Sequence, residues 1–495
     1  MPRALAVSLV VLCAAAGCER AGARGSGARQ LAPAVLFVGA PRLAAAGAAA
    51  DGSEARPFGS IAAALRAAPP GALLRLAEGV YEEQLLITRP VVLLGRGPGR
   101  TRILGQAGER AQAPVVEVRG ADHVELRGLA LELGTVGLLL GKGAGVRLDD
   151  VGLRRFSEAA VIGEGADLTL RGVEVLDIGH GHAARGIELT AGTLDARSVV
   201  VRGAGRRAFI LRGTRAVLAD LDVAWSKLSA VQAVDGADVR VVGGHFEHLG
   251  GAALYAGNAR LSVEGATLVD NEYAVIGFRG AEVSVLDSDL RDHTVAAIAL
   301  VRSRGTVQGC RISRGGSDGA ISVTNASAPI VLLDNRIQDP GPMGLHITDS
   351  SVSARGNTIT GARLDRQKDL GDAIFAINST VQLDQNVLRG NAGSAVTMMA
   401  SELKLVGNGL LDNGRAGLLL LNRSTAVARG NLFERNAAAG VEIGETSRAT
   451  LSQNRFGLNP HFDIDVVCGA GGGGAVNLQG GNTFAGEAAR QRVCP

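Results

Sequence analysis

Aromatic side chains are scarce in this chain. Among its 495 residues, Phe, Trp and Tyr make up 3%, with one Trp and three Tyr, whereas Gly occurs 70 times. A compact core of ordinary shape usually contains several large rings. The composition instead favours a narrow interior filled by Val, Leu, Ile and Ala. The many glycines suit corners in which the backbone needs positive φ.

An excess of charge of one sign is also missing. The chain has 51 basic and 48 acidic residues, a formal charge of +3, which argues against a nucleic-acid partner. The five cysteines include no Cys-x-x-Cys pair, so we expect no zinc site. No other cofactor is expected either.

No apolar run near the N-terminus is long enough to span a bilayer. Arg3 is followed by an apolar stretch from Ala4 to Ala16, which predicts a signal peptide over residues 1–17. The following Ala-Gly-Cys18 resembles the lipobox of bacterial lipoproteins. This resemblance implies cleavage before Cys18, lipid attachment there, and a place in the cell envelope, at the outer membrane or the periplasmic face. The alternative is an ordinary cleaved signal. Residues 18–33 then form the lipidated end and a flexible tether.

A repeat of about 22 residues fills most of the remaining chain. Fifteen anchor positions are each followed, two residues later, by an apolar residue. The anchors are Leu129, Val151, Val173, Ser198, Leu221, Gly244, Ala266, Ser288, Cys310, Asn335, Asn357, Asn386, Asn408, Asn431 and Asn454. A period of this length is typical of a solenoid of stacked coils.

Each repeat contains three short stretches in which apolar and other residues alternate. In the repeat that begins at Asn431, they are 432–434, 441–443 and 449–451. Alternation with a period of two predicts strands with one inward face, and no window in the repeat has the period of a helix. We therefore predict an all-β fold, a right-handed parallel β-helix of about 15–17 coils with 22–23 residues per coil. A leucine-rich repeat, whose period overlaps, is the alternative.

The start of the solenoid has its own signature. Ser60 is a candidate N-cap for a short helix, 61–68, which would cover the open end of the first coil. Gly79-Val80-Tyr81-Glu82 follows. Over residues 51 to about 485 the chain resembles the pectin-lyase-like β-helix superfamily, whose members often open in this way. The expected parts are an N-terminal cap and first coil (34–105), the β-helix (106–465) and a C-terminal cap (466–495).

Two groups of residues have expected structural roles. Six successive anchors are Asn, and inward Asn side chains at tight turns can bond backbone groups and each other in a ladder. These are Asn335, Asn357, Asn386, Asn408, Asn431 and Asn454. In the last segment, Cys468 and Cys494 are the candidates for a disulfide, since exported proteins fold in an oxidising compartment.

Rings and charges gather at one corner of the repeat. Trp225, His248 and Asp270 each stand four residues after an anchor, on successive repeats. Residues next to this corner are further candidates. Rings could stack on sugars while cations meet acidic groups of a glycan. The candidate ligand-binding residues are Trp225, Tyr255, Tyr273, Arg206, Arg207, Lys227 and His248. The other interpretation is a solvated ladder of opposite charges.

Catalytic signatures are incomplete. Gly179-His180-Gly181 matches one element of polygalacturonases, but the paired aspartates that hydrolysis needs do not follow on neighbouring coils. The segment 456–461 resembles an element of alginate epimerases, with Phe456 and Asn459 in place of its tyrosine and carboxylate. The sequence thus predicts a lipid-anchored module that binds polysaccharide or another envelope component, or is structural, without an identified catalytic residue. The alternative is a polysaccharide lyase or epimerase that acts on an acidic glycan. A metal-handling protein, suggested only by His180, His182, His248 and His293, is a weaker third interpretation.

Overall fold

The computed structural model describes residues 33–40, 50–106, 113–178, 184–367, 369–469, 472–485 and 491–492. By internal contacts the chain divides into two units, 1–33 and 34–495, and the description below concerns the second. The expected signal peptide and Cys18 lie outside the described residues. Among the described helices, none is long and apolar enough to cross a membrane.

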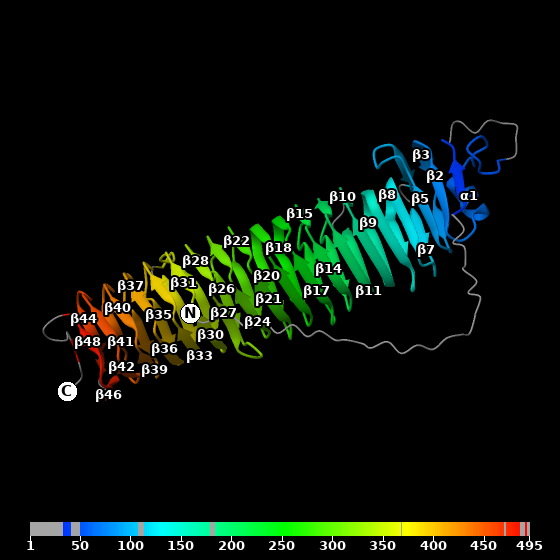
Figure 1. The fold of residues 1–495 in the computed structure, drawn as a ribbon. Helices are drawn as coiled ribbons and strands as arrows, with labels where there is room; N and C mark the ends of the chain where they lie inside the picture. The colour runs from blue at the N-terminus through cyan, green and yellow to red at the C-terminus, as the bar shows by residue number, and fades with distance from the viewer. Residues whose placement is uncertain are drawn as a thin grey trace, which may run out of the picture. The chain divides into compact units, whose positions relative to one another are not determined.

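The second unit is a right-handed parallel β-helix of about 17 turns (Figure 1). Each turn contributes a strand to each of three columns, and every strand pairs in parallel with its equivalent one turn later. Five long strands pass round corners and belong to two or more columns: β8 (Val124–Leu140), β9 (Gly145–Arg171), β11 (Arg185–Arg197), β18 (His245–Gly257) and β20 (Thr267–Phe278). The predicted fold is confirmed, and the leucine-rich repeat is excluded because strands, not helices, form every turn described.

The first column begins at the N-terminal end of the unit. Its remaining strands are β1 (Val35–Val38), β2 (Ala72–Leu76), β5 (Val91–Leu94), β14 (Arg215–Ala219), β17 (Asp238–Val242), β19 (Arg260–Glu264), β21 (Glu282–Leu286), β24 (Arg304–Gln308), β27 (Ile330–Leu333), β30 (Ser351–Arg355), β33 (Thr380–Asp384), β36 (Glu402–Val406), β39 (Thr425–Arg429), β42 (Arg448–Ser452) and β47 (Ala475–Leu478).

The second column carries the residues that follow the anchors. Its remaining strands are β3 (Gly79–Glu82), β6 (Thr101–Leu104), β10 (Glu174–Leu176), β12 (Val200–Arg202), β15 (Asp222–Ala224), β22 (Asp289–Arg291), β25 (Arg311–Ser313), β28 (Arg336–Gln338), β31 (Thr358–Thr360), β34 (Val387–Arg389), β37 (Gly409–Leu411), β40 (Leu432–Glu434), β43 (Arg455–Gly457) and β48 (Thr483–Phe484).

The third column follows the corner at which the sequence placed the candidate ligand-binding residues. Its remaining strands are β4 (Leu85–Ile87), β7 (Val116–Val118), β13 (Phe209–Arg212), β16 (Val231–Val234), β23 (Ala296–Val301), β26 (Ile321–Thr324), β29 (Met343–Thr348), β32 (Asp372–Ile377), β35 (Val396–Met399), β38 (Leu418–Leu421), β41 (Ala439–Ile443), β44 (Phe462–Val466) and β49 (Gln491–Arg492).

Both ends of the solenoid contain strands of the columns. The helix α1 (Ile61–Ala67) begins after Ser60, whose hydroxyl accepts a hydrogen bond from Ala63 N, and it covers the first turns. The columns start at β1, before residue 106, and continue through β47–β49, beyond residue 465. A small antiparallel pair, β45 (Cys468–Gly469) and β46 (Gly472–Gly473), falls between β44 and β47 in the sequence. The segments expected as caps therefore each include coils.

Asparagine side chains satisfy the backbone at the corner before the second column. All six anchor asparagines from Asn335 to Asn454 are 1–3% exposed. Asn408 is typical: its Oδ1 accepts from Asn386 N at 2.7 Å, and its Nδ2 donates to Leu383 O at 2.9 Å and to Asn431 Oδ1 at 3.0 Å. The same bonds repeat from turn to turn, so each amide supplies partners to three consecutive coils.

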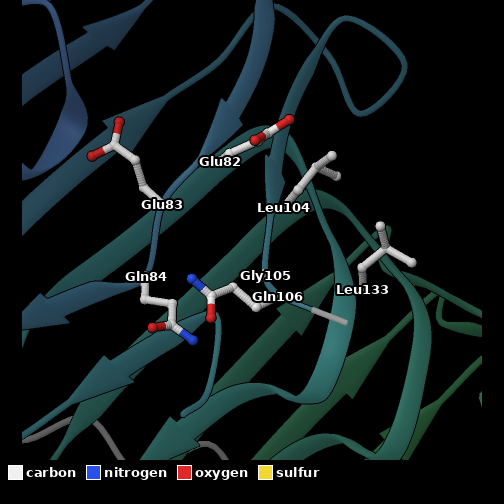
Figure 2. A pocket seen from close by; sticks show the side chains of 7 residues that line it. All are labelled: Glu82, Glu83, Gln84, Leu104, Gly105, Gln106 and Leu133. Atoms are coloured by element: carbon white, nitrogen blue, oxygen red, sulfur yellow. The ribbon is translucent and has the colours of Figure 1, made fainter. Parts of the chain in front are cut away.

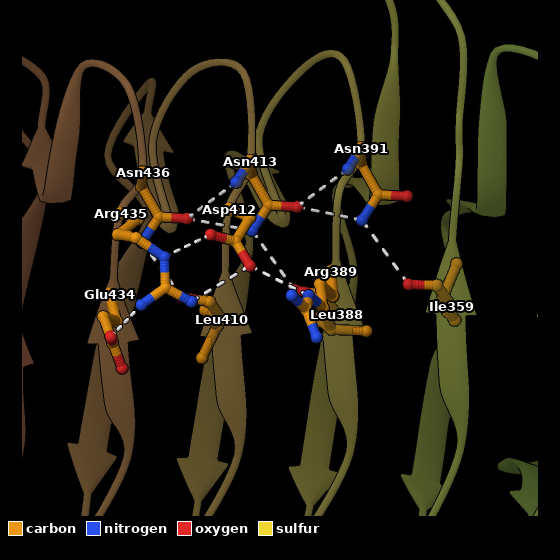
Figure 3. Close-up of polar contacts among 10 residues, drawn as sticks. All are labelled: Ile359, Leu388, Arg389, Asn391, Leu410, Asp412, Asn413, Glu434, Arg435 and Asn436. Carbon is orange, nitrogen blue, oxygen red and sulfur yellow. Dashed lines mark hydrogen bonds and ion pairs between the residues drawn. The ribbon is translucent and has the colours of Figure 1, made fainter.

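A second asparagine ladder, which the sequence analysis missed, lies five residues after the anchors. Asn391, Asn413, Asn436 and Asn459 are 0–2% exposed, and each of the first three donates to the Oδ1 of the next. Figure 3 shows the contacts among Asn391, Asn413 and Asn436. Beside this ladder, Asp412 is held between Arg389 and Arg435 on the two neighbouring turns. Over the later turns, asparagines thus satisfy the corners before and after the second column, and ion pairs occupy the outer surface of the second of these corners.

The ladder can be tested by a change that keeps side-chain volume but removes the amide. Asn408→Leu should lower the free energy of unfolding by about 1–3 kcal/mol, because buried backbone groups of the adjacent coils lose their partners. Asn477→Leu, the same change at an exposed position of β47, should alter it by less than about 0.5 kcal/mol. Urea unfolding measures both. Equal losses would mean that the amide of Asn408 does not stabilise the corner.

Candidate functional site

A pocket of about 460 Å³ lies near the N-terminal end of the unit. Figure 2 shows its lining by Glu82, Glu83, Gln84, Leu104, Gly105, Gln106 and Leu133. The carboxylate of Glu83 accepts hydrogen bonds from the amides of Ile61 and Ala62, both at 2.8 Å. Glu83 therefore caps the N-terminus of α1, where the partial positive charge of the helix dipole also attracts its carboxylate. The carboxylate of Glu83 therefore has a structural role at the start of α1.

The predicted corner holds an exposed pair of stacked rings. Trp225 is 61% exposed, and its ring lies 4.2 Å from that of His248 on the next turn, with 11° between the planes. His248 Nε2 lies 3.2 Å from a carboxylate oxygen of Asp270 on the turn after. Both Trp225 and His248 have positive φ, at 61° and 52°. The rings of Trp225 and His248 are thus nearly parallel on consecutive turns, and the carboxylate of Asp270 holds the imidazole.

Charged residues extend this corner in both directions. Arg314 pairs with Asp292, and Arg363 lies 3.4 Å from Asp339. Such exposed pairs contribute little, roughly 0–1 kcal/mol each. Lys227 and Arg206 are exposed beside the ring pair. The corner is therefore mostly the charge ladder that the sequence allowed, interrupted by one aromatic platform.

The other candidate residues belong to the third column and not to the platform. Tyr255 lies in β18 beside Gln232 and Ile276, with its flanking residues in the core. Burial raises the pKa of Tyr255, while Arg279 and Arg207 act in the opposite direction. Burial also raises the pKa of Tyr273, to which Glu272 and Asp318 add. The seven candidates are therefore divided between two surfaces.

We define the outer strip as the outward residue at the centre of each third-column strand. From turn to turn in register it contains Glu188, Ile210, Gln232, Tyr255, Ile276, Ala299, Ser322, His346, Phe375, Thr397, Leu419, Glu442 and Asp465. Ile210, Ala299 and Leu419 are only 4–7% exposed although they lie outside the hydrophobic core. Neighbouring residues therefore shield parts of the strip from solvent, and polar groups there interact with reduced access to water.

A histidine–carboxylate pair lies in the outer strip. His346 Nδ1 is 2.9 Å from Asp318 Oδ1, and its ring centre is 6.1 Å from that of Phe375. Burial alone would raise the pKa of Asp318, but the bonds to His346 and Ser322 outweigh it and hold this pKa below its usual value. The Asp318 carboxylate thus holds the imidazole of His346 through Nδ1, while Nε2 lies 3.5 Å from Thr348 Oγ1.

A buried carboxyl group lies on the next turn. Asp372 begins β32, is 4% exposed, and accepts a hydrogen bond from Ser394 N. Burial raises the pKa of Asp372 to about 6, against the opposing effects of Ser394 N, Arg415 and Thr397. It closes the longest coil, whose insertion begins after β31 and is tied to neighbouring turns through Arg363 N and Ala362 N. Asp372 can therefore be a neutral acid at mildly acidic pH.

Several predicted residues stay untested. Cys18, Cys494, His180 and His182 lie outside the described residues, so lipidation and the disulfide of Cys468 with Cys494 remain predictions. His293 is 3% exposed, and burial lowers its pKa to about 4. In the described ranges no three His, Cys, Asp or Glu side chains are grouped to hold a metal ion.

The sequence belongs to a known family of repeats. Residues 185–359 and 319–488 match the family described as "Right handed beta helix region", which together is more than half of the chain, so the protein belongs to it. No curated protein matches the sequence.

Several solved structures are similar to this chain at low identity and low TM-score. An alginate lyase from Paenibacillus sp. str. FPU-7 is 13% identical over 59% of this chain and 97% of its own, with a TM-score of 0.37. A periplasmic alginate epimerase is 10% identical over 69% and 78%, with a TM-score of 0.34. The Dettilon tailspike protein is 13% identical over 90% and 68%, with a TM-score of 0.30. These likenesses concern the fold alone.

The sequence also contains a signal for the outer strip, at an offset other than the four residues past each anchor that identified the corner. Tyr255 stands eleven residues after its anchor Gly244, and His346 stands eleven after Asn335. Counting at this second offset would have placed both rings on one surface. Phe375 escapes even this count, because the insertion lengthens its coil.

The raised pKa of Asp372 makes stability depend on pH. Because its folded pKa exceeds its unfolded value, the stability that its protonated form contributes is complete below about pH 4 and is lost as pH rises through about 6. Asp372→Asn should abolish this part of the loss. Denaturant unfolding at pH 4.5 and 7.5 should therefore show a smaller difference for the variant than for the wild type. An unchanged difference would contradict the assignment.

Proposed function

We propose that the protein binds a polysaccharide at the cell envelope and that the platform of Trp225 and His248 is its principal contact. The observation that supports this is the exposure of the only tryptophan in the chain, stacked flat on a histidine that a carboxylate positions. An indole of such exposure contributes nothing to the solenoid core, so a packing role does not account for it. Sugar rings present flat faces of C–H groups that pack well on an indole.

The surroundings of the platform favour a glycan. The exposed cation Lys227 follows Trp225 by two residues, and the exposed Arg206 lies on the preceding turn, whereas protein-binding surfaces usually have a broad apolar centre. Turns of the solenoid recur at about 4.8 Å, close to the length of a sugar unit. A chain that runs along the solenoid can thus meet equivalent positions on consecutive turns.

The outer strip supplies a second set of rings on the same three-column frame. Tyr255, His346 and Phe375 are partly exposed there, in a protein with few aromatics. The guanidinium groups of Arg207 and Arg279 influence Tyr255 electrostatically, whereas the half-exposed carboxylate of Asp318 lies further along the strip beside His346. The two ends of a bound glycan would therefore meet different charges.

Attachment through Cys18 is part of the proposal. The apolar run before it and the small residues directly preceding it support export and lipidation. A lipid anchor followed by the tether of residues 18–33 would hold the β-helix next to a membrane surface, where envelope polysaccharides occur.

Loss of the indole should weaken glycan binding. On a glycan array followed by titration, Trp225→Ala should lose at least about tenfold in affinity, about 1.4 kcal/mol, for the polysaccharide that the wild type binds. Leu458→Ala is the matched control, since Leu458 is 72% exposed with a φ of 49° at the same corner position of a later turn. If Trp225→Ala binds as the wild type does, or if the wild type binds no glycan, the proposed function is wrong. For an acidic glycan, Arg206→Ala should cost less at high salt than at low salt.

Removal of the lipidated thiol should release the protein from the membrane. Cys18→Ala should move from the detergent phase into the aqueous phase on detergent partitioning, while Cys468→Ala should partition as the wild type does. A wild-type protein that stays in the aqueous phase would contradict the lipid anchor without bearing on glycan binding.

A further inference from the structure

The imidazole of His248 has three partners at the platform, and a neutral ring cannot satisfy all of them. Its Nε2 lies 3.2 Å from a carboxylate oxygen of Asp270, and its Nδ1 lies 3.6 Å from a carboxylate oxygen of Glu247. Its face stacks on Trp225, with 4.2 Å between the ring centroids. Among the described residues, the buried Nδ1 has no hydrogen-bond partner. Because a neutral imidazole carries one N–H, its other nitrogen must present a lone pair to a carboxylate.

We propose that protonation of His248 completes the platform and strengthens its binding of a glycan as the pH falls from about 8 to about 5. This inference rests on the proposed glycan binding and adds its regulation. The imidazolium has an N–H at each nitrogen, so it can donate toward Asp270 and Glu247 at once. Its positive charge also lies against the face of the indole, which is the arrangement of a cation–π contact. Loss of the proton removes the charge from both interactions.

The position of the indole depends on the ring of His248. Trp225 is 61% exposed, so the solenoid itself holds little of its side chain. In the part of the chain that the structure describes, the ring of His248 is the only one stacked on it. A sugar that packs on Trp225 must pay the entropy of ordering the indole if the stack is loose. An imidazolium fixed by two carboxylates orders the indole beforehand, and the glycan then binds more tightly.

Two other histidines lie near the same carboxylates. Besides Glu247 and Asp270, the charged or titratable groups around the platform are Arg202, Asp222, Lys227, His245, Asp292 and His293. Of these side-chain types, only histidine ordinarily changes its charge between pH 5 and 8. Burial lowers the pKa of His293 to about 4, so its ring is neutral throughout this range. His245 Nε2 lies 3.2 Å from a carboxylate oxygen of Glu247, so the test must separate His245 from His248.

The stack can be tested without any glycan, because Trp225 is the only tryptophan in the chain. An imidazolium in contact with an excited indole quenches its fluorescence more strongly than a neutral imidazole does. The emission of the full-length protein should therefore fall as the pH is lowered from about 8 to about 5. His248→Gln should abolish this change, whereas His245→Gln should retain it. Asp270→Asn should shift its midpoint to lower pH, because the imidazolium loses a carboxylate.

A glycan array probed at both pH values, followed by titration of the neutral or uronate member that binds most tightly, tests the effect on binding. The wild type should bind it about three- to tenfold more tightly at the lower pH, the range of a cation–π contact. His248→Gln should bind it equally at both.

The two assays separate this inference from the proposed function. Wild-type fluorescence that does not change with pH, or a change that persists in His248→Gln, would overturn the protonated stack whether or not a glycan binds. Equal affinities of the wild type at the two pH values would overturn its control of binding. An array on which the wild type binds nothing at either pH would instead contradict the proposed function, and the fluorescence would still report on the stack.

Discussion

Every turn of this solenoid must bury the backbone of its corners, and the polar groups there need partners. Before and after each second-column strand the chain turns within a few residues, so its amides and carbonyls cannot all join the ladders of the sheets. Over the later turns, asparagine amides supply the missing partners at both corners, for example Asn408 before β37 and Asn413 after it. Because each amide bonds to the turns before and after it, the register of one coil fixes that of the next. An unsatisfied buried group would cost about 1–3 kcal/mol at each turn.

This repeated constraint divides the residues into two classes. Inward positions accept only residues that fit a narrow interior, such as Leu345 and Ile347 on either side of His346. Outward positions and the tips of corners stay free to vary, since the coil does not need their side chains. Trp225, His346 and Phe375 all occupy such positions. Departures from the repeat's small and aliphatic composition at these places therefore point to function more directly than departures in the core do.

The two surfaces that depart from the repeat differ in chemistry. At the corner, the rings of Trp225 and His248 are stacked and His248 lies between the carboxylates of Glu247 and Asp270, which suits binding to a sugar face. Beside the outer strip, the half-exposed Asp318 pairs with His346 and its pKa is lowered, whereas burial raises the pKa of Asp372. One solenoid thus presents two outward surfaces of different chemistry.

The sequence by itself determined the period, the three strands of each coil, and the asparagine anchors, since all of these are local patterns that recur at a fixed spacing. It also identified Trp225 and His248, which share one offset from their anchors and stack in the structure. Only the tertiary structure decided that Tyr255 and Tyr273 lie away from this pair and that Asp318 meets His346, 28 residues later. Coils of unequal length shift the offset of each outward residue, so linear counting loses the register that strand pairing restores. Burial, which moves the pKa of Asp372, arises from neighbouring turns and has no counterpart in its local sequence.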